Sequence, residues 1–236
     1  MHEHAHGRRA IETMIRSQDL GGLLRLVETF HGHLCPFISL GVKAGQYAMS
    51  ELDRPNTGME EIVAIVECNN CFTDGIQVVT GCTFGNNALI FKDLGKTAVT
   101  VARRDDGRAV RLLVRPDYRE KMFARYPNTK PLFQKIIGQR QGSAEERHRF
   151  EHMWEAIARR ELKTPLEEQF VIQSLTITLP EYARLVDSLI CSVCGESVMA
   201  TRTVGPVEQP LCLECARREH YLLTGQGISC VSREQT

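Results

Sequence analysis

Histidines and cysteines gather in two stretches of the N-terminal half, where their types and spacing could bind a metal. Residues 30–37 read FHGHLCPF, and three more cysteines follow within residues 68–82. Thiolates and imidazoles suit Zn²⁺ or another late transition metal, whereas Mg²⁺ and Ca²⁺ prefer oxygen ligands. If only two or three of these groups bind, water or a substrate could occupy an open coordination position. The candidate ligands are His31, His33, Cys35, Cys68, Cys71 and Cys82.

Two other interpretations of these residues stay open. An imidazolium beside Cys35 would lower the pKa of its thiol, so Cys35 could be a catalytic nucleophile instead of a ligand. Buried cysteines next to a histidine that ends a helix would produce the same pattern without any chemistry. The convergence of so many soft groups favours ligands over a nucleophile.

Polar residues close to these cysteines could assist either kind of site. We expect Asp74 and Gln77 to orient a bound water or a ligand histidine, and Asp74 joins Cys35 as a candidate catalytic residue. Lys96 follows Gly95 and could neutralise an anionic ligand, although a lysine in a turn is usually solvated.

A second group of cysteines has the spacing of a structural zinc site. Two C-x-x-C pairs are separated by seventeen residues, which fits the zinc pattern C-x₂-C-x₁₅₋₂₀-C-x₂-C. Four thiolates fill a tetrahedral shell, so this site is expected to be closed and structural. The module around it is too short to bury much apolar surface, so the metal would supply its folding energy. The four cysteines are Cys191, Cys194, Cys212 and Cys215.

Regular elements can be predicted around these sites. Apolar periodicity predicts one helix that ends near residue 30 and a second from Ser39 to Leu52. The β-branched run 61–68 predicts a strand, and residues 97–116 predict a hairpin that turns at Asp106-Gly107. Charged helical sequence follows. We also expect a short helix at 74–79, another helix at 165–174 and a short strand at 175–179.

These elements predict an α+β fold. N-terminal helices would pack on a mainly antiparallel sheet, with a helical insert and a small C-terminal zinc-ribbon module. We place the core domain at residues 1–186 and the ribbon at residues 187–236, because the sequence becomes rich in cysteine there.

The composition excludes several classes of protein. The 236 residues carry 29 basic and 29 acidic side chains, and this zero net charge argues against nucleic-acid binding. No apolar run approaches the ~18–20 residues that span a bilayer, so no membrane association is expected. The start MHEHAHGRRA lacks the apolar stretch of a secretory signal. We therefore expect a cytoplasmic protein, whose nine cysteines have metal or redox roles and are not a set of disulfides.

Four short segments, in this order, resemble the FmdE family, which takes its name from formylmethanofuran dehydrogenase. They are FHGHLCP at 30–36, CFTDGIQ at 71–77, TGCTFG at 80–85 and Gly95-Lys96. The resemblance extends over residues 20–115, and the C-x-x-C module resembles family members with an appended zinc ribbon. It implies an α+β core, a homodimer, and a metal pocket built from the HGHxCP loop and the cysteine loops.

Carried over residue by residue, the resemblance implies two sets of site residues. Two positions depart from the family pattern: Phe37 replaces a common glycine and could narrow the pocket mouth, and Gly75 replaces a common alanine. Cys68 lies outside the pattern and is the weakest candidate ligand. The implied core ligands are His31, His33, Cys35, Cys71 and Cys82, and the residues expected to bind a small ligand are Gln77, Thr83 and Lys96.

Two functional hypotheses follow, and whether the chain is an enzyme stays open. In the first, a core pocket with Zn²⁺ or another transition metal does chemistry or holds a small ligand. The family name links that pocket to one-carbon metabolism and to molybdenum or tungsten enzymes. In the second, the chain is an accessory protein that delivers or senses a metal, or docks on a larger oxidoreductase through the ribbon. An open coordination position favours the first hypothesis, and a filled shell with a transferable metal favours the second.

Overall fold

A five-stranded sheet in the order β2-β1-β3-β4-β5 organises the first part of the chain. In the computed structural model, which describes residues 6–232, all five side chains of the interior strand β1 (Ile62–Val66) are buried. β1 pairs in parallel with β2 (Leu89–Phe91) and antiparallel with β3 (Ala98–Arg103). β4 (Arg108–Val114) and β5 (Phe170–Thr176) continue the antiparallel pairing. The sheet is therefore mainly antiparallel, which confirms the predicted α+β class.

Two compact units make up the chain, residues 1–180 and 181–236, and each is described by itself. The division falls after Pro180, a few residues before the boundary predicted at residue 186. Residues 1–5 and 233–236 lie outside the described part. Among residues 6–232, no helix is both long and apolar enough to cross a membrane.

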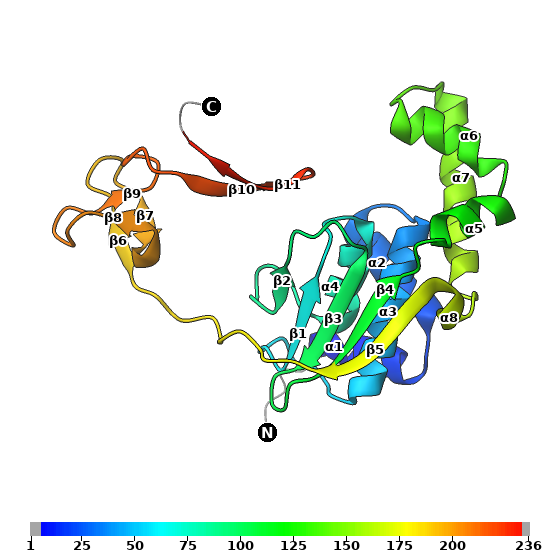
Figure 1. Cartoon of the computed structure of the whole chain (residues 1–236), viewed down its shortest axis with the longest axis horizontal. Coiled ribbons are helices and arrows are strands. Elements are labelled where there is room, and N and C mark those ends of the chain that lie inside the picture. Colours follow the sequence, from blue (N-terminus) through cyan, green and yellow to red (C-terminus); the bar gives the residue numbers. More distant parts are fainter. Residues whose placement is uncertain (1–5, 233–236) are drawn as a thin grey trace. The chain divides into compact units, whose positions relative to one another are not determined.

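Helices α1 (His6–Arg16), α2 (Leu20–His31), α3 (Pro36–Leu52) and α4 (Cys71–Thr80) cover one face of the sheet (Figure 1). Asp19 caps α2 by accepting a hydrogen bond from the backbone N–H of Gly22 at 2.8 Å. α3 begins at Pro36, earlier than predicted, because proline is well suited to the first position of a helix. Together these helices bury the alternate side chains of β1, which are Ile62, Ala64 and Val66.

Two glycines allow α3 and α4 to pack backbone against backbone. A Cβ atom on Gly41 would lie 2.2 Å from the carbonyl oxygen of Phe72, and one on Gly75 would lie 2.8 Å from backbone atoms of Gly41. Neither position can hold a side chain unless the backbone shifts. This close approach fixes where α4 begins relative to α3, and both helix starts carry candidate site residues.

We expect Gly75→Ala to lower the free energy of unfolding of the first unit by about 3 kcal/mol, because an overpacked methyl forces the two helices apart. Denaturant titration followed by circular dichroism measures this. Gly85→Ala is the matched control, since no atom lies within 4 Å of the position that its Cβ would take; it should change stability by less than about 0.5 kcal/mol. Equal free energies of unfolding for the two variants would show that the close approach of α3 and α4 at Gly75 leaves room for a methyl group.

A helical insert joins β4 to β5 and stands beyond one end of the sheet (Figure 1). It contains α5 (Tyr118–Arg125), α6 (Thr129–Phe133), a π-helical turn (Gln134–Gly138) and α7 (Ala144–Glu161). Ser143 and Glu146 form a capping box at the start of α7. Aromatic rings of the three helices pack together, namely Phe123, Phe133, Phe150 and Trp154.

Buried polar contacts attach this insert to α3. Lys43 donates hydrogen bonds to Gln169 Oε1 and, at 3.3 Å, to the carbonyl oxygen of Glu161. Ser39 donates to the carbonyl oxygen of Ala158 at 2.7 Å. Because buried polar groups are costly when unpaired, these contacts hold α7 at one position against α3.

The prediction of a helix at 165–174 is wrong. Only Leu166–Gln169 is helical, as the single turn α8, and β5 begins at Phe170. The segment becomes a strand because it pairs with all of β4, from Phe170 opposite Val114 to Thr176 opposite Arg108. Tertiary pairing has overridden the local helical pattern.

The second unit consists of short antiparallel pairs. β6 (Ser188–Ile190) pairs with β7 (Ser197–Met199), and the short helix Ala200–Arg202 follows. The other pairs are β8 (Thr203–Val204) with β9 (Leu211–Cys212), and β10 (His220–Thr224) with β11 (Gly227–Val231). Few of its side chains are buried, so it has little apolar core of its own.

Candidate metal centres

Three helix ends position the N-terminal histidines and cysteines. His31 is the last residue of α2, and Gly32 follows in the left-handed conformation with φ 90°, which turns the chain away from the helix. Cys35 is the N-cap residue of α3. Cys71 is the first residue of α4, whose start is capped by the Asn70 side chain. Helix packing therefore brings residues that are distant in the chain to one place.

Three of the predicted ligands meet there. One ring nitrogen of His31, one of His33 and the sulfur of Cys71 all lie within 4.8 Å of one another. The two imidazole rings are 4.5 Å apart between centroids. Cys35 is buried beside them, and its thiol shares a hydrogen bond with that of Cys71. The structure thus brings together His31, His33 and Cys71 as possible ligands, with Cys35 in contact.

Asp74 orients His31. The Nδ1 atom of His31 lies 2.6 Å from Asp74 Oδ2, and Gln77 Nε2 donates to Asp74 Oδ1 at 3.1 Å. The backbone N–H of Phe84 in turn donates to Gln77 Oε1 at 3.3 Å. A carboxylate that accepts Nδ1–H leaves Nε2 of the same ring as a lone-pair donor toward a metal, an arrangement common around zinc.

The environment of His31 Nε2 also suits a metal ligand. Nε2 of His31 is buried, lies beside the Cys71 thiol and makes no hydrogen bond of normal geometry among residues 6–232. A buried acceptor without a partner is costly, and most such atoms in proteins are satisfied. A metal ion shared with His33 and Cys71 would satisfy this atom, with a nitrogen and sulfur donor set that suits zinc.

The two thiols beside His31 differ in their acidity. The hydrogen bond from Cys35, together with the neighbouring His31 ring, lowers the pKa of Cys71 to about 6. The same contact with Cys71 and the burial of Cys35 raise the pKa of Cys35 far above its usual range. Cys71 therefore carries the thiolate at neutral pH, and Cys35 acts as its hydrogen-bond donor. This favours Cys71 over Cys35 as both ligand and reactive thiol.

The structure does not bring Cys82 into this group. It follows α4, and a ten-residue helix is about 15 Å long, so Cys82 lies at the opposite end of α4 from Cys71. Its buried thiol donates to the carbonyl oxygen of Ile62 at 3.3 Å. Cys68 contacts Asn70 and not the histidines.

Thr83 and Lys96, the other two residues expected to bind a small ligand, have local structural roles. Thr83 and Asn86 exchange hydrogen bonds, because each backbone N–H donates to the side chain of the other, at 2.9 and 3.2 Å. These bonds stabilise the turn after Cys82. Lys96 is exposed, and its backbone N–H donates to the carbonyl oxygen of Glu67 at 3.0 Å. Neither contact points to a ligand.

Glu151 lies near the site, and this was not predicted from the sequence. Desolvation by nearby protein atoms and the adjacent His31 lower the pKa of His33, although its side chain is exposed, whereas the charge of Glu151 on α7 raises it. α7 therefore lies close to the HGH loop, although no local pattern connects the two segments.

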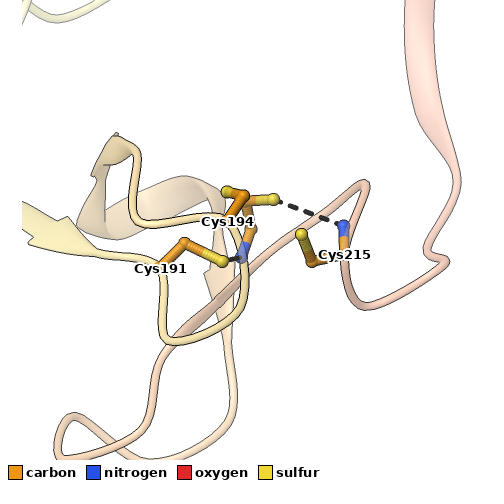
Figure 2. A group of neighbouring side chains, drawn as sticks. Cys191, Cys194 and Cys215 are labelled. Carbon is orange, nitrogen blue, oxygen red and sulfur yellow. Dashed lines mark hydrogen bonds between the residues drawn. The ribbon is translucent and has the colours of Figure 1, made fainter.

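The four ribbon cysteines converge as predicted. Their sulfur atoms lie within 4.8 Å of one another, and Figure 2 shows Cys191 and Cys194 on one turn opposite Cys215 on another. Backbone N–H groups donate to two of the sulfurs: Cys212 to Cys191 at 3.4 Å and Cys215 to Cys212 at 3.3 Å. Backbone N–H groups, chiefly that of Cys194, lower the pKa of Cys191 to about 6. This group could hold a metal ion.

The fold is thus an α+β domain with a histidine and cysteine group at its helix ends, followed by a four-cysteine module, and both groups could hold a metal ion. The model of the family described as FmdE, Molybdenum formylmethanofuran dehydrogenase operon, matches residues 30–171. The chain belongs to the FmdE family. The match includes the HGH loop, α4 and the helical insert, and it ends before the four-cysteine module.

Two known proteins are similar to the chain. The "Probable S-adenosyl-L-methionine-binding protein" of Archaeoglobus fulgidus is 43% identical over 210 residues, which is 87% of this chain and 55% of that protein. The chain thus spans about half the length of that relative. The crystal structure of an FmdE-like protein from Syntrophus aciditrophicus, named for a tungsten formylmethanofuran dehydrogenase, has a TM-score of 0.53 and 18% identity, over 84% of this chain and 91% of that one. At this identity the likeness concerns the fold.

We expect Asp74→Asn to weaken metal binding at the core group by about 10- to 100-fold, the usual effect of losing a carboxylate that orients a ligand histidine. Competition with a chromophoric zinc chelator measures this affinity. Asp105→Asn, in the exposed β3–β4 turn, is the control and should bind like the unchanged protein. If the two variants bind the core metal equally, Asp74 does not act on His31 in the way described.

Proposed function

We propose that the chain is a zinc protein with two independent metal sites. The first is an open core centre at His31, His33 and Cys71, and the second is a closed structural site at the four ribbon cysteines. The observation that carries the core centre is the buried Nε2 atom of His31, which makes no hydrogen bond of normal geometry among residues 6–232 while Nδ1 is held by Asp74. Zinc is the metal that best suits both donor sets.

Three protein ligands leave a fourth position for water or a small ligand. A zinc ion in such a site supplies Lewis acidity, which polarises a bound oxygen or makes a bound water more acidic. The chain's own residues would set up this position. Asp74 fixes the ring of His31, and the thiol of Cys35 donates to the Cys71 thiolate and so limits its basicity.

The small ligand and the partner are part of the same proposal. S-adenosylmethionine is the first small molecule to test, because the Archaeoglobus fulgidus relative is named for binding it. Its amino and carboxylate groups could occupy open positions on a zinc ion. The family description names a molybdenum formylmethanofuran dehydrogenase operon, and we further propose that the protein acts with a molybdenum or tungsten oxidoreductase of one-carbon metabolism. We also propose, as the resemblance and the sequence led us to expect, that it is a cytoplasmic homodimer.

A second function, metal delivery, is favoured by one observation. His33 is exposed and Cys71 is partly exposed, so a metal held there could be passed to another protein. The chain would then be a non-catalytic accessory protein. If the core centre is open, the metal stays in place and binds the small ligand. If the chain delivers metal, the core site does not bind a small ligand and gives up its metal.

Cobalt substitution separates them. The visible absorption of Co²⁺ reports its ligands, and a His31→Ala/Cys71→Ser variant provides the spectrum of the ribbon site alone. With the core centre proposed here, S-adenosylmethionine or a small thiol should shift the core bands and leave the ribbon bands unchanged. The opposite result is that no added ligand shifts the core bands and that a chelator removes the core metal rapidly. This result would contradict the open centre and support metal delivery.

A further inference from the structure

Two exposed histidines on α7 form a second type of metal-ligating pair. His148 and His152 are four residues apart, and their Nε2 atoms lie 3.0 Å from each other. Their ring centroids are 4.3 Å apart, with an angle of 81° between the planes. The pair does not belong to the core group of His31, His33 and Cys71, nor to the ribbon cysteines.

The distance between the two Nε2 atoms matches the distance between two nitrogens that bind one metal ion. Residues at positions i and i+4 share one face of a helix. Two imidazole nitrogens that are each about 2.0–2.1 Å from a zinc-sized ion lie roughly 3.0–3.4 Å apart. The Nε2 atoms of His148 and His152 stand at the lower end of this range and share a hydrogen bond. An ion would replace the shared proton once the two rings turn their lone pairs toward it, with almost no movement of the helix.

The helix that carries the pair is well fixed. α7 has 18 residues and a complete capping box, and its side chains Phe150, Trp154 and Ile157 are buried. Binding would therefore cost little conformational entropy. Glu151 is exposed and three residues after His148, so it adds a negative charge on the same side of the helix.

We propose that His148 and His152 form a surface site for a divalent late transition metal ion. Neutral imidazole nitrogens bind Ni²⁺, Cu²⁺ and Zn²⁺ more tightly than Mg²⁺ or Ca²⁺. Two neutral ligands hold an ion less tightly than four thiolates, so this site fills after the cysteine sites and exchanges its metal readily. It does not depend on the function proposed for the core centre.

The only tryptophan of the chain, Trp154, lies on the same helix as the pair, on its buried side, within the short range over which a bound paramagnetic ion quenches fluorescence. Paramagnetic Ni²⁺ bound at the pair should quench its fluorescence, and Ni²⁺ does not oxidise thiols. The full-length protein would be loaded with zinc, desalted and titrated with Ni²⁺. We expect saturable quenching, at least 10-fold weaker binding in His148→Ala and in His152→Ala, and unchanged binding in His220→Ala, which removes an exposed histidine of β10.

The variants should fold, because alanine is a better helix former than histidine at an exposed position. The proposal is overturned if His148→Ala and His152→Ala titrate like the unchanged protein. It is also overturned if quenching disappears in Cys71→Ser and persists in His148→Ala, since the ion would then lie at the core centre. A zinc-loaded protein that shows no saturable quenching, and no additional Ni²⁺ in equilibrium dialysis, overturns it as well.

Discussion

A Cys191→Ser/Cys215→Ser variant should have an unfolded second unit and a fully folded first unit. The second unit buries little apolar surface, and a structural zinc ion contributes about 10–16 kcal/mol of apparent binding free energy in small modules, which becomes folding free energy. Loss of two thiolates removes that contribution. The first unit has its own sheet and core, so its stability should not change.

Limited proteolysis with mass spectrometry measures this difference. Cleavage should occur within residues 188–231 in the variant, whereas these residues should be protected in the unchanged protein; the largely exposed segment 181–187 is open to cleavage in both. Cys230→Ser is the matched control, because Cys230 is exposed, lies outside the four-cysteine group and donates a hydrogen bond to Glu219 Oε2 at 3.7 Å. Protection of residues 188–231 in the double variant would mean that the module folds without a metal at these cysteines.

Alkylation of Cys71 in the metal-free protein should be half-maximal near pH 6, about three pH units below an ordinary thiol. The hydrogen bond from Cys35 and the ring of His31 stabilise the thiolate and hold its pKa at about 6. Because this pKa is lower in the folded state than in the unfolded state, the thiolate contributes stability that is complete above the ordinary thiol pKa. That contribution is lost as the pH falls through 6.

Mass spectrometry of iodoacetamide-treated protein at different pH values measures this midpoint for each cysteine. Cys35→Ala should move the midpoint of Cys71 upward, since it removes the hydrogen bond that is the main cause of the low pKa. Cys82→Ser should leave it unchanged, because Cys82 lies at the far end of α4. A midpoint near that of a free thiol in all three proteins would contradict the assignment of Cys71 as the thiolate.

Local signals in the sequence predicted much of the fold. Asp106-Gly107 turns the β3–β4 hairpin as predicted, because this short pattern fixes backbone geometry by itself. The two C-x-x-C pairs predicted the ribbon group for the same reason: each turn aims its two thiols locally. A short strand was predicted at 175–179, but β5 extends over Phe170–Thr176; its earlier start could not be predicted, since its pairing with β4 depends on contacts distant in the chain.

The core group could be predicted only in part. The sequence indicated a short helix at 74–79, but α4 extends over Cys71–Thr80. That longer helix separates Cys71 from Cys82, two residues that were expected to bind one metal. The partnership of His31 with Asp74 depends on how α2 and α4 pack, and the approach of Glu151 depends on how α7 packs on α3. Neither kind of contact leaves a local pattern.

Metal content per chain tests the central claim most directly. Elemental mass spectrometry would be applied to the zinc-loaded, desalted protein and to a His31→Ala/Cys71→Ser variant whose folding is verified by circular dichroism. Two independent sites predict about two zinc ions in the unchanged protein and about one in the folded variant. About one zinc ion in both would assign all tightly bound metal to the ribbon cysteines. The group at His31, His33 and Cys71 would then be a thiol site without a metal, contrary to the function proposed here.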